Sequence, residues 1–295
     1  MPVLAYPSFT VGSWQTNIID TTGVTWWGSS PDYGNGPSVR TNITEKPYGD
    51  GAFRIRSFRP SRTITIQGAA ECPTRNACMA AADMLKGLFQ DGQQRVLTVD
   101  DGVSTRTCTV ELAAEPKVAF AGPASFDYQL PLIAADPRMY STATMTAITT
   151  LPTPGATGLN WSPTASAGLN WAPSASAGLD WGSVSSNGRL SMANPGTAST
   201  WPVFTLIGPL ISPVITDVSS GNTFAYTDYL ATSADYLVIT NSPFNRGVML
   251  QGTTDRFPLM SSTQWMEITA GGSLTVALSG AGSGQLQATW NPAYW

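Results

Sequence analysis

The chain has 295 residues, of which 42% are hydrophobic and only 12% are charged, and its net charge is −4. An acidic chain lacks the basic surface that nucleic-acid-binding proteins present, so we expect no specific nucleic-acid binding. The chain contains no histidine, which excludes Ser-His and Cys-His nucleophile pairs and removes the commonest general base and metal ligand.

The charged fraction is about half of the usual ~25%, so we expect neighbouring subunits to cover much of the surface. Cys72, Cys78 and Cys108 have neither metal-ligand nor Cys-x-x-Cys spacing. We interpret them as free, mostly buried thiols of a protein made in a reducing cytosol, and we expect no metal and no cofactor. No apolar run reaches the ~18 residues of a membrane span, and no secretory leader is expected.

The N-terminal part begins with strand-like stretches such as Ser8–Val11, followed by a Gly- and Pro-rich segment from Gly28 to Gly51. An irregular connection of this length is often functional. Two interpretations stay open: a surface loop, or an arm that reaches an adjacent subunit. The residues proposed for this inter-subunit arm are Thr41, Asn42, Ile43, Thr44, Glu45 and Lys46.

Alternation in Arg62–Gly68 predicts a strand with Ile64 and Ile66 on one face. The next segment predicts a helix over residues 74–90, with Thr74 or a neighbour as N-cap and Gly92 as the stop. Its apolar stripe comprises Ala77, Ala81, Met84, Leu85, Leu88 and Phe89.

A predicted hairpin joins Val96–Val99 to Thr105–Leu112 through the turn at Asp100-Asp101-Gly102. A strand at Lys117–Phe120 follows, and then a long one with Phe126, Tyr128, Leu130 and Leu132 on one side. Residues 1–145 therefore form a predicted antiparallel β domain that carries one helix.

Three near-copies of one phrase occur with a ten-residue period: Gly158–Trp161, Gly168–Trp171 and Gly178–Trp181. We interpret residues 146–190 as a Pro/Ser/Ala-rich spacer between two domains. Either Trp161, Trp171 and Trp181 pack back on a neighbouring domain, or they dock a sugar or a partner.

Residues 191–295 predict strands only, at the spacing of a β-sandwich or jelly roll. The predicted strands are Val203–Ile207, Val214–Val218, Thr223–Tyr226, Tyr236–Ile239, Gly247–Leu250, Trp265–Ile268, Leu274–Leu278 and Gln285–Trp290. Four aromatic residues of this part, Trp265, Trp290, Tyr294 and Trp295, are candidates for interface packing or for stacking on sugar rings.

Without histidine, pairs of carboxylates are the remaining candidates for acid–base catalysis. None of them lies in a sequence pattern typical of a catalytic site. Asp100-Asp101 fits a tight turn better than catalysis. Gly271-Gly272 and Gly280–Gly284 lack the Lys-Ser/Thr ending of a phosphate loop. We expect no catalytic residue and no enzymatic activity, although a glycosidase pair assembled from distant positions stays open.

Two ordered patterns go beyond a generic β protein. The first runs from Arg62–Gly68 through the helix and hairpin to Asp136–Tyr140, and the second from Asn194–Val203 to Ser212-Pro213. Together they resemble the distal tail proteins of long-tailed, siphovirus-type bacteriophages, and the repeat spacer is similar to insertions in phages of actinobacteria. Thr240-Asn241 stands where that family often has an acidic residue.

The resemblance implies a split-barrel-like, tail-tube-related N-terminal domain and a galectin-like C-terminal sandwich. It implies a hexameric ring at the virion tail tip, assembled in the host cytoplasm. The implied partners are the tail tube protein, the baseplate hub, other minor tail proteins or fibres, the tape measure protein and host cell-wall carbohydrate. The alternatives are a carbohydrate- or receptor-binding tail module and a tail tube subunit.

Overall fold

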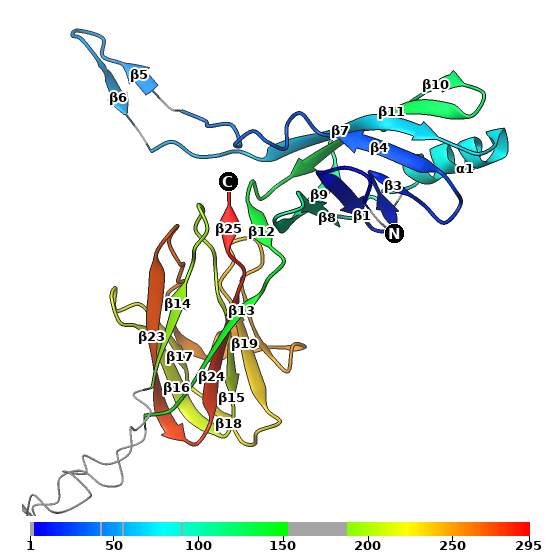
Figure 1. The fold of residues 1–295 in the computed structure, drawn as a ribbon. Coiled ribbons are helices and arrows are strands. Elements are labelled where there is room, and N and C mark those ends of the chain that lie inside the picture. Colours follow the sequence, from blue (N-terminus) through cyan, green and yellow to red (C-terminus); the bar gives the residue numbers. More distant parts are fainter. Residues whose placement is uncertain (1–2, 42, 55, 90, 153–187) are drawn as a thin grey trace, which may run out of the picture. The chain divides into compact units, whose positions relative to one another are not determined.

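The computed structural model describes residues 3–41, 43–54, 56–89, 91–152 and 188–295, in which mainly β structure is confirmed (Figure 1). The chain divides into two compact units. The N-terminal unit comprises Met1–Thr144, Pro195–Ser199 and Asn291–Trp295, and the C-terminal unit comprises Met145–Asn194 and Thr200–Trp290.

This division differs from the predicted boundaries in two ways. Residues 146–190 are not all spacer, because their two ends form strands of the C-terminal unit, and residues 153–187 lie outside the described part. The predicted C-terminal domain, 191–295, also loses Pro195–Ser199 and Asn291–Trp295 to the N-terminal unit, where Ala198 and Ala293 form an isolated β-bridge. Bridge partners so far apart in the chain leave no local pattern in the sequence.

An eleven-stranded antiparallel sheet builds the N-terminal unit, in the order β2-β1-β8-β9-β11-β7-β4-β3, with β10 on β11 and β12 between β9 and β25. The strands are β1 (Ser8–Val11), β2 (Trp14–Gln15), β3 (Ile18–Ile19), β4 (Thr25–Ser29), β7 (Arg62–Glu71), β8 (Arg95–Asp100), β9 (Thr105–Leu112), β10 (Lys117–Gly122), β11 (Ser125–Ala134), β12 (Met139–Ser141) and β25 (Ala293–Tyr294). A separate two-stranded hairpin consists of β5 (Ile43–Glu45) and β6 (Ala52–Arg54).

The two longest strands of this sheet form its centre, and their pairing follows from the alternation in the sequence. Ile64 of β7 is opposite Leu132 of β11, and Ile66 is opposite Leu130. All four side chains are fully buried. Because successive side chains of a strand point to opposite faces, this register places one apolar row of each strand in the same core.

The single predicted helix is confirmed, but it is shorter than expected. Helix α1 spans Arg75–Lys86, and its N-cap Thr74 accepts a hydrogen bond from the Ala77 backbone N–H. Gly87 caps the C-terminus, so the predicted stop at Gly92 is wrong. The buried stripe is Cys78, Ala81, Ala82 and Leu85, whereas Met84 is exposed and Phe89 is buried beyond the helix end.

The C-terminal unit consists of two antiparallel sheets with one common core, as the predicted sandwich requires. One sheet contains β13 (Met145–Thr150), β24 (Gln285–Trp290), β15 (Val203–Ile207), β19 (Tyr236–Thr240), β20 (Gly247–Leu250) and β21 (Thr254–Asp255). The other contains β14 (Arg189–Ala193), β23 (Ser273–Gly282), β16 (Leu210–Asp217), β17 (Thr223–Tyr226), β22 (Met260–Thr263) and β18 (Tyr229–Leu230). A short 3-10 helix, η1, spans Phe257–Leu259.

One predicted strand of this unit is wrong in position. Residues Trp265–Ile268 form no strand, and the strand there is β22, a few residues earlier. The segment is instead held by a bridge between Ile268 and Thr200 and by the buried Asn241. Asn241 Oδ1 accepts from the Met266 N–H at 3.0 Å, and its Nδ2 donates to the Pro202 carbonyl at 2.7 Å. An amide is needed here because one end accepts and the other donates.

Candidate functional site

The residues predicted as an inter-subunit arm lie on the β5–β6 hairpin, which Figure 1 shows as a separate ribbon. Ile43, Thr44 and Glu45 form β5 and pair with Arg54, Phe53 and Ala52 of β6. Thr41 and Lys46 flank β5 and are exposed, and Asn42 lies outside the described residues. The prediction of an irregular segment is thus wrong for the hairpin itself.

The hairpin exposes three large apolar side chains beside charged ones. Ile43 is 62% exposed, Phe53 is 59% exposed and Tyr48 is fully exposed. In the described part of the chain, β5 and β6 pair only with each other. The register pairs Ile43 with Arg54 and Phe53 with Thr44, so Ile43 and Phe53 lie on opposite faces of the hairpin, and each is a candidate contact for another chain.

Two backbone hydrogen bonds join the segment that enters the hairpin to the segment that leaves it. Arg40 and Phe58 bond to each other, N–H to carbonyl in both directions, and so close the base of the arm. Arg59, the next residue, donates from Nη1 to the Pro37 carbonyl at 3.3 Å. We define residues 39–60 as the arm.

The C-terminal residues of the chain pack on arginines of the N-terminal unit. The guanidinium carbon of Arg59 is 4.3 Å from the centre of the Trp295 ring, and that of Arg138 is 5.2 Å away. Arg106 is 4.2 Å from the Tyr294 ring centre. Cation–π contacts at these distances are attractive, so β25 is attached by side chains as well as by its pairing with β12.

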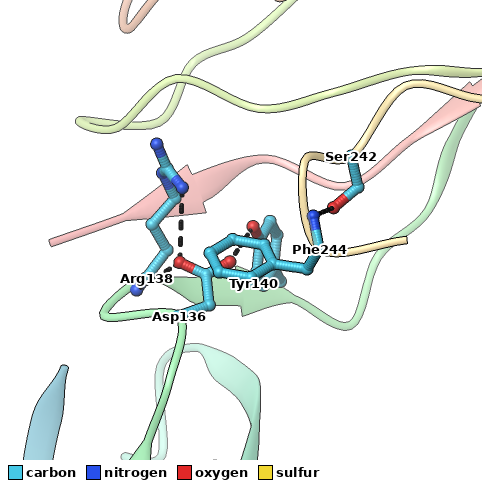
Figure 2. A network of polar contacts seen from close by, with 5 residues as sticks. All are labelled: Asp136, Arg138, Tyr140, Ser242 and Phe244. Carbon is cyan, nitrogen blue, oxygen red and sulfur yellow. Dashed lines mark hydrogen bonds and ion pairs between the residues drawn. The ribbon is translucent and has the colours of Figure 1, made fainter. Parts of the chain in front are cut away.

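A carboxylate organises one of these arginines (Figure 2). Asp136 Oδ1 accepts from Arg138 Nη1 at 3.3 Å, and Oδ2 accepts from the Tyr140 hydroxyl at 2.5 Å. Burial, together with the charge of Asp136, raises the pKa of Tyr140 well above its ordinary value. A hydroxyl that stays protonated is a permanent donor, which indicates a structural role for this group.

The candidate sugar-stacking tryptophans that the structure describes are in contact with protein groups. Trp290 is 6% exposed, and its Nε1 donates to the Ala193 carbonyl at 2.8 Å. Phe257 stacks on Trp265 with ring centres 6.4 Å apart, and Arg246 lies 4.9 Å from the same ring. Trp161, Trp171 and Trp181 lie outside the described residues.

The carboxylates that sequence analysis singled out form a turn. Asp101 Oδ1 accepts from the N–H groups of Val103 and Ser104, and Asp100 Oδ1 accepts from Gly102. The hydrogen bond from Ser104 is the main reason why the pKa of Asp101 is lowered. The preferred interpretation of this pair as turn residues is confirmed.

The described residues include no metal-binding cluster, and their cysteines form no disulfide. No group of three His, Cys, Asp or Glu side chains there could hold a metal ion. Cys72, Cys78 and Cys108 are free thiols, as predicted, and burial raises the pKa of Cys108 to about 12. Among the helical residues described, none belongs to a helix long and apolar enough to cross a membrane.

The sequence singled out residues 41–46 but gave no sign of the Arg40–Phe58 pairing or of the C-terminal contacts. Arg59, Arg106 and Arg138 carry no motif, and their aromatic partners are distant in the chain. The sequence did contain one sign that Arg62 is buried. Arg62 alternates in phase with Ile64 and Ile66, which places it on the core face of the strand.

No family model and no curated protein matches the chain in sequence. Solved structures do match in fold. The crystal structure of the Dit protein of phage SPP1, described as a paradigm of the hub adsorption apparatus in phages that infect Gram-positive hosts, superposes with a TM-score of 0.65 at 12% identity. The match covers 98% of this chain and 99% of the SPP1 protein.

Two structures of the phage P2 baseplate in its activated conformation, with calcium and with strontium, contain chains that match with a TM-score of 0.51. Their identities to this chain are 9% and 10%, and at least 96% of each chain is covered. Both of the units described above are therefore included in these matches. The chain has, over nearly its full length, the fold of the SPP1 Dit protein and of chains of the phage P2 baseplate.

Proposed function

We propose that the chain is a structural subunit of a bacteriophage tail tip, and that its copies form a ring that joins the tail tube to the baseplate hub. The observation that carries this proposal is the match to the SPP1 Dit protein over 98% of one chain and 99% of the other. A match of this extent includes both units in the same order along the chain. It therefore does not depend on a single β domain of a kind that many unrelated proteins share.

The composition and the site support a structural role over a catalytic one. The chain has no histidine, and its acidic turn residues are committed to backbone hydrogen bonds. The low charge of the whole chain, and the large apolar side chains exposed on the arm, suit a protein whose surface is covered by further copies of itself. The C-terminal sandwich would then hold peripheral tail proteins or fibres.

The oligomeric state tests the ring. Sedimentation of the purified full chain should give a species of six times 31.2 kDa, and negative-stain images should show an annulus. A chain that remains a monomer at every concentration, alone and mixed with its tail tube protein, would contradict the proposal. Filaments without a closed ring would favour a tube subunit instead.

The arm is proposed as the contact between neighbouring copies. Deleting Thr41–Asp50 should leave both units folded but abolish association, because it removes Ile43 and Tyr48, exposed apolar side chains that a neighbouring copy would cover. A milder variant is Phe53→Ser, with Val103→Ser as matched control, since Val103 is 96% exposed on a hairpin turn. If both serine variants assemble alike and the deletion variant still forms rings, the arm does not connect the copies.

The alternative of a carbohydrate-binding module has less support, because Trp265, Trp290 and Trp295 contact protein groups. It predicts that host cell-wall polysaccharide changes the tryptophan fluorescence of a monomer or dimer. The same polysaccharide should leave the fluorescence of the proposed ring unchanged.

A further inference from the structure

Arg62, at the start of β7, is a cation on the core face of the sheet. It is only 5% exposed and lies in the row of side chains that continues with Ile64 and Ile66. Its guanidinium carbon is 6.0 Å from the centre of the Tyr33 ring. Burial of this group is the main reason why the pKa of Arg62 is lowered.

The hydrogen bonds of Arg62 are incomplete within the described protein. Nη2 donates to the carbonyls of Tyr33 at 2.7 Å and Asn35 at 3.1 Å. Nε and Nη1 are buried and have no acceptor among the described residues. No ion pair joins Arg62 to any carboxylate of the described residues, and the nearby Arg106 adds positive charge.

The two N–H groups of Arg62 Nη2 thus donate to neutral carbonyls, and no carboxylate of the described residues pairs with the positive charge of the guanidinium. A buried cation without an anionic partner is costly, and carbonyl groups offset that cost only in part. A water molecule can accept from Nε or Nη1 but brings no charge. A carboxylate does both, and guanidinium–carboxylate hydrogen bonds are about twice as strong as neutral ones.

A cavity adjoins Arg62 at the base of the arm. Its volume is about 400 Å³, and its wall includes Arg62, the loop residues Asp32 and Ser38, and the neighbours of Arg62 in the chain, Ser61 and Thr63. Asp32 is the acidic residue of the wall, and its Oδ2 accepts from the Thr65 N–H at 3.3 Å. Ser38, Ser61 and Thr63 are further polar residues of the wall.

We propose that the cavity at the arm base, with Arg62 in its wall, binds a carboxylate group. Two sources have this chemistry: a free organic acid, and an acidic side chain of a second copy. The second source rests on the proposed ring, and the arm itself supplies two candidates, Glu45 and Asp50, both exposed. A copy that inserts its arm beside the arm base of the next would make a head-to-tail contact, the kind that closes rings.

Acetate is the probe for the site itself. In the full-length, ¹⁵N-labelled chain, acetate should shift the Nε–H signal of Arg62, assigned with Arg62→Lys, whereas neutral acetamide should not. Ser61→Trp fills the cavity from an exposed position and should weaken acetate binding at least about tenfold, since it removes a charge-assisted hydrogen bond. Ser233→Trp, exposed in the C-terminal unit, is the matched control and should bind acetate as the unchanged chain does.

Sedimentation separates the two sources. If an acidic side chain of a second copy is the ligand, Ser61→Trp and the double variant Glu45→Gln/Asp50→Asn should both weaken association, and acetate should compete with it. If acetate binds while association is unaffected by these variants, the ligand is a free organic acid. The proposal is overturned if acetate leaves the Arg62 signal unmoved and the double variant associates normally; Arg62 then only anchors the 32–38 loop. The acetate experiment needs no ring, so its outcome is independent of the proposed function.

Discussion

Arg59 and Trp295 come from distant parts of the chain, yet the guanidinium carbon of one lies 4.3 Å from the ring centre of the other. Arg59 lies near the end of the arm, and Trp295 follows β25. The contact therefore ties the base of the arm to the C-terminal residues within one unit.

Arg59→Met should lower the free energy of unfolding of the N-terminal unit by about 0.5–2 kcal/mol, because it removes the cation beside the Trp295 ring and the hydrogen bond to the Pro37 carbonyl but keeps most of the side-chain length. Urea unfolding followed by tryptophan fluorescence measures the loss. Arg40→Met, at the other side of the arm base and exposed, is the control and should change little. Equal losses in both variants would show that the ring contact contributes nothing.

Thr74→Ala should destabilise the chain by about 1 kcal/mol, because the Ala77 N–H loses the hydroxyl that caps the helix at 3.2 Å. Thr74→Ser keeps an accepting hydroxyl and should stay close to the original stability. Thermal and urea unfolding of the three proteins give the comparison. A serine variant as weak as the alanine variant would rule out capping as the cause.

Gly68→Ala should cost about 2 kcal/mol or more. A Cβ atom at Gly68 would overlap the carbonyl oxygen of Trp27 on the neighbouring strand β4, and backbone can yield only by moving the strand. Gly49→Ala, on the arm, is the control, since no other part of the chain lies within 4 Å of the position that its Cβ atom would take. Unfolding midpoints in urea should separate the two variants clearly.

Asp217 should make stability depend on pH. Burial acts to raise the pKa of Asp217, but hydrogen bonds from Ser220 and Ser219 outweigh it and lower the pKa. The ionised form is therefore favoured in the folded state, and this stabilisation is present above the ordinary pKa of about 3.9. It is lost as the pH falls through the lower, folded-state pKa.

Asp217→Ala should cost about 1.5–3 kcal/mol at pH 7, because the Ser219 N–H and two hydroxyls lose a charged acceptor. Asp217→Asn should lose part of this. Both differences from the unchanged chain should shrink as the pH falls below about 4 in unfolding experiments. A difference that grows in acid would contradict the assignment of a lowered pKa.

Asn241→Asp should destabilise the sandwich by about 1–3 kcal/mol, since a carboxylate would face the Pro202 carbonyl where the amide now donates. The exposed Asn245 provides the control variant, Asn245→Asp, which should be nearly neutral. A neutral outcome for both variants would mean that the buried amide is dispensable.

Local patterns predicted the parts of the fold that local interactions determine. The alternation of Ile64 and Ile66, the turn at Asp100-Asp101 and the cap at Thr74 all concern neighbours in the chain, and the structure has them as predicted. The helix end was misplaced because Gly87 and Gly92 are both plausible stops, and packing decides between them. The β5–β6 hairpin was missed because its exposed apolar residues contribute to no core.

The sequence by itself determined a mainly β chain with one helix, two domains and no histidine-based chemistry. Only the tertiary structure decided that Pro195–Ser199 and Asn291–Trp295 belong to the N-terminal unit, and that Arg62 lies buried beside a cavity. The physical reason is the range of the interactions. Strand periodicity and capping act between neighbours in the chain, whereas the bridge of Ala198 to Ala293 and the surroundings of Arg62 depend on segments that meet only after folding.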